Sequence, residues 1–197
     1  MSQIDYVQLE RIGANLSCLG DRFGVLVNAI RETSGIGGEI WECGAFKGGT
    51  AILTKCVTRE TGRKIRIFDT FAGLPYSDES DTHPVGAMAS DYDEVKSLFD
   101  DIPDCFIYRG IMPETFAGLE DSVISVAHID VDQYRCVKEV LEWVYPRVHT
   151  GGYIVIDDYN CHSCPGAKKA VDEFLIGKTE VLRADGGTNP QAHFIKT

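Results

Sequence analysis

Two pairs of aspartates, each at the end of an apolar run, constrain the fold of this chain more than any other feature. Asp130 and Asp132 follow the first run, and Asp157 and Asp158 follow the second. The runs are nearly continuous in apolar residues and rich in Val and Ile, which is typical of parallel strands that are buried on both faces. The sequence therefore predicts two buried strands that both end in carboxylates.

The spacing of the two runs predicts that these strands are neighbours in one sheet. They cover residues 123–129 and 152–156, and one helix-length segment, 134–148, lies between them. A strand, a helix and a strand form a right-handed crossover, and adjacent strands lie about 4.8 Å apart. Three or four carboxylates would then converge at the carboxyl edge of the sheet, where open α/β sheets bind their ligands. Such a cluster of oxygen ligands needs a hard divalent cation, Mg²⁺ before Ca²⁺.

The rest of the chain continues an alternation of strands and helices, which defines a parallel α/β sheet with helices on both faces. Further strands are expected at residues 39–43, 64–68 and 105–108, and further helices at 48–61, at 92–99 and from Pro165. Strands at 179–183 and 192–196, joined by the turn-forming residues 185–190, are expected to pair as a hairpin. We therefore predict a doubly wound, Rossmann-like sheet of the class I methyltransferase type, mostly parallel with an antiparallel C-terminal hairpin strand.

The N-terminal region is predicted to be helical. Apolar residues recur at helical spacing from residue 6 to residue 32, with a break expected near Gly20. We expect residues 1–34 to pack as a helical segment on a single domain formed by residues 35–197, because this length suits one core. The exposed face of these helices could form a homodimer. The polar stretch 72–90 is long for a connection, and its length is typical of a lid or a disordered loop.

The charge of the chain argues against two classes of partner. The formal net charge is −11, whereas nucleic acid and anionic membrane both require a basic surface. No apolar stretch approaches the roughly 20 residues that span a bilayer. The N-terminus lacks the basic and apolar regions of a signal peptide, so we expect a cytoplasmic protein.

Seven cysteines are scattered along the chain, and their odd number favours free thiols. Cys161 and Cys164 have a C-x-x-C spacing, but no second pair of zinc ligands is evident at a suitable distance. A redox C-x-x-C usually opens the first helix of a small βαβ domain, whereas this one follows a late strand. We therefore interpret the two thiols as part of an ordinary loop and helix cap.

A glycine-rich segment lies where the strand 39–43 should turn into the next helix. It reads Glu42-Cys-Gly-Ala-Phe-Lys-Gly-Gly-Thr50, and its glycines allow positive φ and a close approach of the backbone to a ligand. The spacing matches neither the dinucleotide-binding fingerprint nor the P-loop. A plain strand-to-helix connection would also explain the glycines.

An acidic residue shifts this balance towards a cofactor site. Asp69 ends the strand 64–68 and lies 27 residues after Glu42, about one βαβ step. It could bind two ribose hydroxyls, or it could cap the loop that follows. S-adenosylmethionine has no phosphate and carries positive amino and sulfonium groups, which suit an acidic site. We therefore favour S-adenosylmethionine as the cofactor.

Five segments carry a joint pattern in a specific order and spacing. They are Glu42 to Gly49, Asp69 to Pro75, Asp130 to Tyr134, Asp157 to Tyr159 and Cys164 to Phe174. In these segments the chain resembles the macrocin O-methyltransferase family, over about residues 36–197. The resemblance implies the Mg²⁺-dependent transfer of a methyl group from S-adenosylmethionine to a hydroxyl. The acceptor would be a sugar-like or other vicinal-diol small molecule, modified in a natural-product or glycan pathway.

The resemblance also implies roles for individual residues. Asp130, Asp157 and Asp158 would hold the metal, and Asp132 would be the catalytic base. The cofactor would contact Glu42, Gly44, Phe46, Gly48, Gly49, Thr50, Asp69, Thr70, Phe71, Gly110 and Asp130. Because side chains alternate along a strand, Asp157 and Asp158 can both face the metal only if the chain bends there.

Several alternatives remain open at this point. His83 and His162, in expected loops near the same edge, are weaker candidates for the base, and His128 is interpreted as a buried core histidine. A catechol-type O-methyltransferase would use the same cofactor and metal with a flat aromatic acceptor. A nucleotide-sugar glycosyltransferase also uses a D-x-D motif, but it would not need the glycine-rich segment or the second aspartate pair. A binding module without activity is the weakest alternative.

Overall fold

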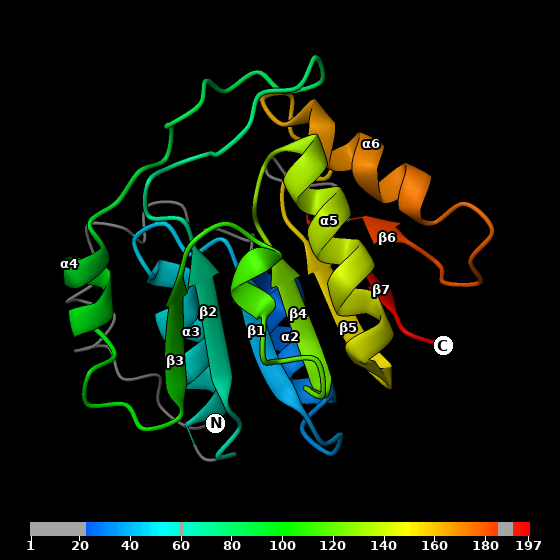
Figure 1. The fold of residues 1–197 in the computed structure, drawn as a ribbon. Coiled ribbons are helices and arrows are strands. Elements are labelled where there is room, and N and C mark those ends of the chain that lie inside the picture. The colour runs from blue at the N-terminus through cyan, green and yellow to red at the C-terminus, as the bar shows by residue number, and fades with distance from the viewer. Residues whose placement is uncertain (1–22, 60, 185–190) are drawn as a thin grey trace.

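The computed structural model describes residues 23–59, 61–184 and 191–197. Its strands are β1 (Glu39–Cys43), β2 (Ile65–Asp69), β3 (Cys105–Arg109), β4 (Ile124–Ile129), β5 (Val148–Ile156), β6 (Arg183–Ala184) and β7 (Ala192–Ile195). Its helices are α2 (Gly24–Glu32), α3 (Gly49–Thr58), α4 (Tyr92–Ser97), α5 (Tyr134–Val144) and α6 (Pro165–Phe174), with short 3₁₀ turns at η3 (Glu114–Phe116) and η4 (Tyr145–Arg147). Strands and helices alternate along the chain, as the sequence predicts (Figure 1).

The strands form a seven-stranded sheet in the order β3-β2-β1-β4-β5-β7-β6. The pairs β1–β2, β2–β3, β1–β4 and β4–β5 are parallel, whereas β7 runs antiparallel to both β5 and β6. The doubly wound sheet with an antiparallel C-terminal hairpin strand is therefore confirmed. The turn expected at 185–190 lies outside the described residues.

The prediction of a strand at 179–183 is wrong for residues 179–182, because β6 contains only Arg183 and Ala184. Residues 179–182 are held instead by the side chain of Glu180, which points inward and is buried. It accepts hydrogen bonds from the Tyr145 hydroxyl at 2.6 Å and the Thr197 hydroxyl at 3.1 Å. Side-chain bonds thus take the place of a backbone ladder in this stretch.

Three helices end earlier than the periodicity predicts. The segment 134–148 leaves the α-helix after Val144, because Pro146 cannot donate an N–H bond and lies in the 3₁₀ turn η4. Strand β5 then begins at Val148, four residues before its expected start. Helices α3 and α4 end at Thr58 and Ser97. In the N-terminal region, α2 is helical as expected, whereas the break near Gly20 lies outside the described residues.

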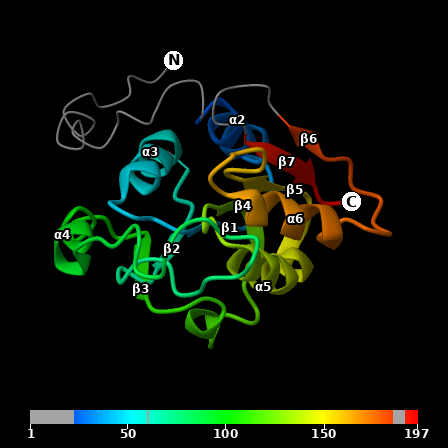
Figure 2. The same ribbon diagram turned by 90° about the horizontal axis from the view of Figure 1, so that it is seen from above.

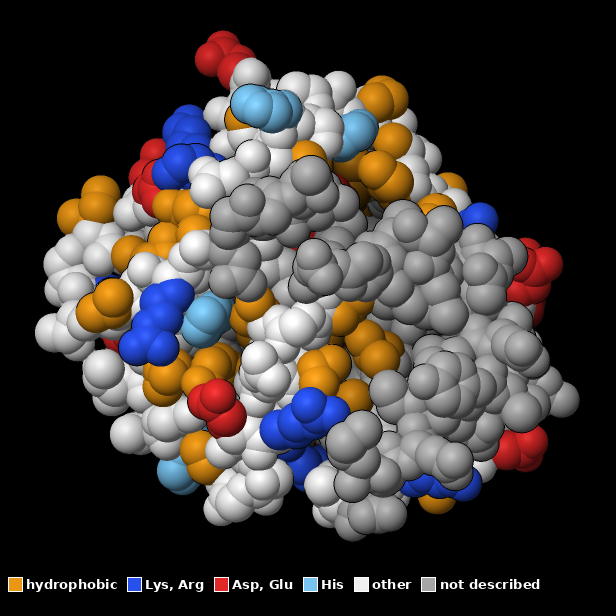
Figure 3. Space-filling model, turned by 180° about the vertical axis from the view of Figure 1, so that it is seen from behind, with side chains coloured by type: hydrophobic (Ala, Val, Ile, Leu, Met, Phe, Trp, Pro, Cys, Tyr) orange, Lys and Arg blue, Asp and Glu red, His pale blue; other side chains and the backbone are white. Residues whose placement is uncertain are grey.

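The two faces of the sheet are covered by different helices. Helices α5 and α6 pack on one face, and α2 and α3 pack on the other, which Figure 2 shows from above. On the face covered by α5 and α6, the rings of Trp41, Phe68, Phe116 and Trp143 pack against one another, with centroids 4.7–5.4 Å apart. Seen from behind, hydrophobic, basic and acidic side chains are intermixed on the described surface (Figure 3). Among the described residues, no helix is both long enough and apolar enough to cross a membrane.

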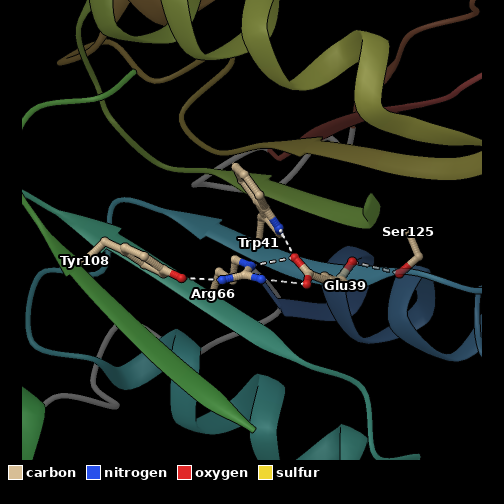
Figure 4. Close-up of polar contacts among 5 residues, drawn as sticks. All are labelled: Glu39, Trp41, Arg66, Tyr108 and Ser125. Carbon is tan, nitrogen blue, oxygen red and sulfur yellow. Dashed lines mark hydrogen bonds and ion pairs between the residues drawn. The ribbon is translucent and has the colours of Figure 1, made fainter. Parts of the chain in front are cut away.

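A polar network joins three adjacent strands beside the aromatic core (Figure 4). Glu39 of β1 forms a two-pronged ion pair with Arg66 of β2, at 2.6 and 2.8 Å, and accepts a hydrogen bond from Trp41 Nε1 at 3.0 Å. Arg66 also donates to the hydroxyl of Tyr108 on β3. Burial alone would raise the pKa of Glu39, but the bonds from Arg66 and Trp41 hold that pKa below its usual value.

We predict that Arg66→Leu lowers the free energy of unfolding by about 2 kcal/mol, because it leaves the mostly buried Glu39 carboxylate without its main partner. The folded-state pKa of Glu39 is depressed, so the contribution of the pair is present above the unfolded pKa, near 4.5. It is lost as the pH falls through the folded pKa. Denaturant titrations at neutral pH and at about pH 4 should therefore show a smaller difference between wild type and variant in acid.

Lys138→Met is the matched control, because Lys138 forms an exposed ion pair with Glu142 within one helix. Such a pair contributes only about 0.5 kcal/mol. Equal losses in the two variants would contradict a structural role for the buried network.

Candidate active site

A cavity of about 560 Å³ opens at the carboxyl edge of the sheet. It is lined by residues that follow β1, β2, β4 and β5, and so lies where the strand order reverses between β1 and β4. Doubly wound sheets bind ligands at this switch point, and the volume is typical of small-molecule sites. The topology therefore places the predicted glycine-rich segment and three of the predicted carboxylates, Asp130, Asp132 and Asp158, around one cavity.

The turn after β1 passes extremely close to the end of β4. Gly44 has a φ of +93°, and a Cβ atom on it would lie 1.8 Å from the carbonyl oxygen of Asp130. Its N–H donates to the carbonyl of Phe68 on β2, while Asp130 N–H donates to the carbonyl of Cys43, both at 2.8 Å. Only glycine fits this position, and its lack of a side chain brings the ends of β1 and β4 together.

Asp69 fixes the same turn from the neighbouring strand. One of its carboxylate oxygens accepts hydrogen bonds from the backbone N–H groups of Ala45 and Phe46, both at 2.8 Å. The other oxygen accepts from the N–H of Phe71 at 2.7 Å. The structure thus shows the capping role that the sequence left open. A carboxylate has about four acceptor sites, and Asp69 also lines the cavity, so ribose binding stays a prediction.

Three carboxylates meet on one wall of the cavity. Oxygens of Asp130, Asp132 and Asp158 all lie within 4.8 Å of one another. Asp132 and Asp158 each have a φ of +55°, a conformation that is uncommon for residues other than glycine. Burial, and next the negative charge of Asp158, raise the pKa of Asp132 to about 6. The mutual repulsion of these groups is what a bound cation would relieve.

Asp157 does not join this cluster. Its carboxylate is buried, and one oxygen accepts a hydrogen bond from the Gln191 amide at 2.9 Å. Gln191 in turn lies 3.5 Å from Nε2 of His128, which is buried as the sequence predicts. Asp157 and Asp158 both follow the end of β5 at Ile156, and the chain bends at Asp158, where φ is +55°, so the two side chains face different surroundings. Of the three predicted metal ligands, the structure brings Asp130 and Asp158 together and leaves Asp157 outside.

Glu42 lies behind the glycine turn, not on the cavity wall. It is almost completely buried, and neither carboxylate oxygen makes a hydrogen bond of normal geometry within the described residues. Burial, and next the charges of Asp130 and Asp69, raise the pKa of Glu42 well above its ordinary value. Both effects favour the uncharged form of this carboxyl group. Its predicted contact with the cofactor stays a prediction.

The predicted cofactor residues divide into two groups. Those that line the cavity are Gly44, Phe46, Gly49, Thr50, Asp69, Thr70 and Asp130. Those that do not line it are Glu42, Gly48, Phe71 and Gly110. The second group supports the first through the backbone. Gly48, for example, has a φ of +80° at the start of α3, and Phe71 donates its N–H to Asp69.

The long loop 72–90 reaches across the cavity. Its length and composition alone did not distinguish such a lid from a disordered loop. In Figure 1 it rises from β2 towards the starts of α5 and α6 before it descends to α4. Asp81 accepts a hydrogen bond from the N–H of Tyr134 at 2.9 Å, and Thr82 donates to the carbonyl of Ser163. These bonds hold the loop over the site, so that His83 lines the cavity.

The sequence analysis missed the contribution of the C-x-x-C segment. Cys161, Ser163 and Cys164 line the cavity, and the Cys164 thiol donates to Asp132 at 3.2 Å. Burial, and next the charges of Asp132 and Asp158, raise the pKa of Cys164. Cys164 therefore stays a protonated thiol beside the carboxylates. The sequence did contain a signal for this position, because Cys161 and Cys164 lie only three and six residues after Asp158.

The comparison with known families confirms the resemblance seen in the sequence. The model of the macrocin O-methyltransferase family (TylF) matches residues 19–181. That match covers most of the chain, which therefore belongs to this family.

The curated relatives are named as O-methyltransferases of a rhamnosyl-tetracenomycin and of a novobiocin derivative. The chain is 28% identical to 8-demethyl-8-(2,3-dimethoxy-alpha-L-rhamnosyl)-tetracenomycin-C 4'-O-methyltransferase of Streptomyces olivaceus over 151 residues, which are 68% of this chain and 57% of the relative. It is also 28% identical to demethyldecarbamoylnovobiocin O-methyltransferase of Streptomyces niveus over 155 residues, which are 70% of this chain and 58% of the relative. The matched part is thus less than two thirds of either relative.

Two solved structures show the same fold. The O-methyltransferase NovP superposes with a TM-score of 0.76 at 24% identity, over 90% of this chain and 80% of NovP. The calicheamicin methyltransferase CalS11 superposes with a TM-score of 0.73 at 23% identity, over 95% of this chain and 85% of CalS11. These likenesses establish the class I methyltransferase architecture of the sheet.

We predict that Gly44→Ala lowers the free energy of unfolding by at least about 2 kcal/mol, because the added methyl group collides with the backbone of Asp130. Gly62→Ala is the matched control. Gly62 also has positive φ, at +61°, but a Cβ there has nothing within 4 Å. It should cost only about 1 kcal/mol. Thermal unfolding measures both, and equal losses would show that the close approach is not what restricts position 44.

Proposed function

We propose that this protein methylates a hydroxyl group of a sugar-like small molecule with S-adenosylmethionine as methyl donor. The observation that carries this proposal is the convergence of Asp130, Asp132 and Asp158 on a cavity that the Gly44 turn also lines. The three carboxylates suit a hard cation and an acceptor hydroxyl. The glycine turn suits a cofactor without phosphate. Membership of the macrocin O-methyltransferase family agrees with both.

The cofactor is proposed to lie against the glycine turn. Gly44 and Gly49 expose backbone to the cavity, and Asp69 and Asp130 give this end an acidic character that suits a positively charged ligand. S-adenosylmethionine supplies an electrophilic methyl group on its sulfonium, and the reaction leaves S-adenosylhomocysteine. Asp69 keeps the turn in shape through its bonds to Ala45 and Phe46, whether or not it also binds the ribose.

A hard divalent cation, Mg²⁺ in the first instance, is proposed to be held by Asp130 and Asp158. These two are both predicted ligands and members of the cluster. Mg²⁺ usually binds proteins through one or two carboxylates and keeps its other positions for water or substrate. When bound, such a cation orients an acceptor diol and lowers the pKa of its hydroxyl. One oxygen of Asp157 instead accepts a hydrogen bond from Gln191, and Asp157 does not line the cavity.

Asp132 is then free to act as the general base. It lines the cavity beside Asp130 and Asp158, and the thiol of Cys164 holds one of its oxygens in place. In this role its carboxylate accepts the proton of the acceptor hydroxyl, and the oxygen forms its new bond to the methyl carbon as the carbon–sulfur bond breaks. A general base must be ionised at the working pH, and a cation on the neighbouring Asp130 and Asp158 would favour the ionised form of Asp132.

The sugar-like acceptor is preferred to the catechol alternative because the chain belongs to the macrocin O-methyltransferase family, and one relative is named for the methylation of a rhamnosyl-tetracenomycin. The same family match removes the reason to consider a nucleotide-sugar glycosyltransferase. The acceptor end of the cavity is formed by His83, Met88 and Cys161, which combine polar and apolar surface. Such a mixed wall suits a sugar that is attached to an apolar body.

We predict that Asp158→Asn lowers Mg²⁺-dependent methyl transfer at least about 10- to 100-fold, the loss that even outer-shell changes cause at metal sites. The affinity for S-adenosylhomocysteine, measured by calorimetry, should change little. Asp157→Asn is the matched control, because its side-chain oxygen can still accept the bond from Gln191. A large loss in Asp157→Asn with none in Asp158→Asn would reverse the choice of ligand, and no loss in either would remove the cation from the proposal.

Asp132→Asn should lower kcat by about 10²- to 10⁴-fold, because the variant has no base to accept the hydroxyl proton. The affinities for Mg²⁺ and S-adenosylhomocysteine should stay close to those of wild type. A parallel loss of Mg²⁺ affinity in this variant would instead make Asp132 a metal ligand. Single-turnover rates combined with a Mg²⁺ titration distinguish the two roles.

A further inference from the structure

The segment 158–164 folds two thiols back onto the acidic cluster. Cys161 N–H donates to the carbonyl of Asp158 at 3.0 Å, and Cys164 N–H donates to the carbonyl of Cys161 at 3.1 Å. These successive turns bring Sγ of Cys161, Sγ of Cys164 and a carboxylate oxygen of Asp158 within 4.8 Å of one another. The Ser163 hydroxyl lies between the two sulfurs, 3.0 Å from one and 3.6 Å from the other.

This arrangement is close to the geometry of a tetrahedral metal site. Zinc–sulfur bonds of about 2.3 Å place two sulfur ligands about 3.8 Å apart, so the observed set needs to contract by about 1 Å at most. Cys164 is buried, and Cys161 is partly exposed to the cavity through which a cation would enter. A water molecule in the cavity can supply a fourth ligand.

We propose that Asp158, Cys161 and Cys164 form a binding site for a thiophilic divalent cation such as Zn²⁺. Two sulfur ligands and one carboxylate select Zn²⁺, Co²⁺ or Cd²⁺ over Mg²⁺, which prefers oxygen ligands only. On binding, each thiol loses its proton to solvent, and Cys164 exchanges its bond with Asp132 for a bond to the metal. The C-x-x-C segment is then a ligand pair and not an ordinary loop.

The site shares Asp158 with the hard-cation position. If the proposed function holds, a thiophilic ion takes a ligand from Mg²⁺ and inhibits methyl transfer. The two cations thus compete for one carboxylate although they prefer different partners. Metal binding at the thiols can still be measured without cofactor or acceptor, so its outcome does not depend on the proposed function.

Titration of the reduced, full-length protein with Co²⁺ in a buffer without Mg²⁺ tests the proposal. Thiolate–cobalt bonds give a charge-transfer absorption that oxygen ligands do not give. Cys161→Ser and Cys164→Ser each remove one ligand. Cys105→Ser is the matched control, because Cys105 begins β3 and therefore lies at the opposite edge of the parallel sheet. Circular dichroism establishes that each variant is folded.

We expect one Co²⁺ per chain with a thiolate absorption that Zn²⁺ displaces. Cys161→Ser and Cys164→Ser should lose this absorption and bind at least about tenfold more weakly, whereas Cys105→Ser should match wild type. Absence of the absorption in wild type would overturn the site. So would its persistence in Cys161→Ser, a change at a partly exposed position that the fold should tolerate.

Discussion

Repulsion among carboxylates at one edge of the sheet is the constraint on which this site depends. Burial, and next the charges of Asp130 and Asp69, raise the pKa of Glu42, and burial, and next the charge of Asp158, raise the pKa of Asp132. The chain tolerates this crowding in three ways. It buries Glu42, whose raised pKa favours the uncharged form, it surrounds Asp69 with backbone N–H donors, and it places Asp130, Asp132 and Asp158 on the cavity wall. A cation in the cavity would neutralise part of the charge of this last group.

The backbone around the cavity stores strain that a packed core elsewhere must offset. Residues other than glycine with positive φ include Phe46, Met88, Asp132 and Asp158, and all four line the cavity. Each such conformation costs on the order of 1–2 kcal/mol. The cost is concentrated where the side chains must face a ligand and not the sheet. At Asp158 the positive φ bends the chain, so that its side chain points away from that of Asp157.

The strands and their order could be predicted because buried parallel strands have a simple apolar pattern, and the aspartates that end them are visible in the sequence. The direction of single side chains could not. Whether Asp157 or Asp158 faces the cavity depends on a local bend, and the position of Glu42 behind the turn depends on packing. The path of loop 72–90 could not be predicted either, because individual hydrogen bonds, such as the one from the Tyr134 N–H to Asp81, fix it.

The most direct test of the account is a calorimetric titration of the protein with S-adenosylhomocysteine, once with Mg²⁺ and once with EDTA. The cofactor is proposed to lie against the Gly44 turn and the cation on Asp130 and Asp158, so the two sites are separate. We therefore expect binding in both conditions, and methyl transfer to a sugar diol only when Mg²⁺ is present. Failure of S-adenosylhomocysteine to bind in either condition would contradict it.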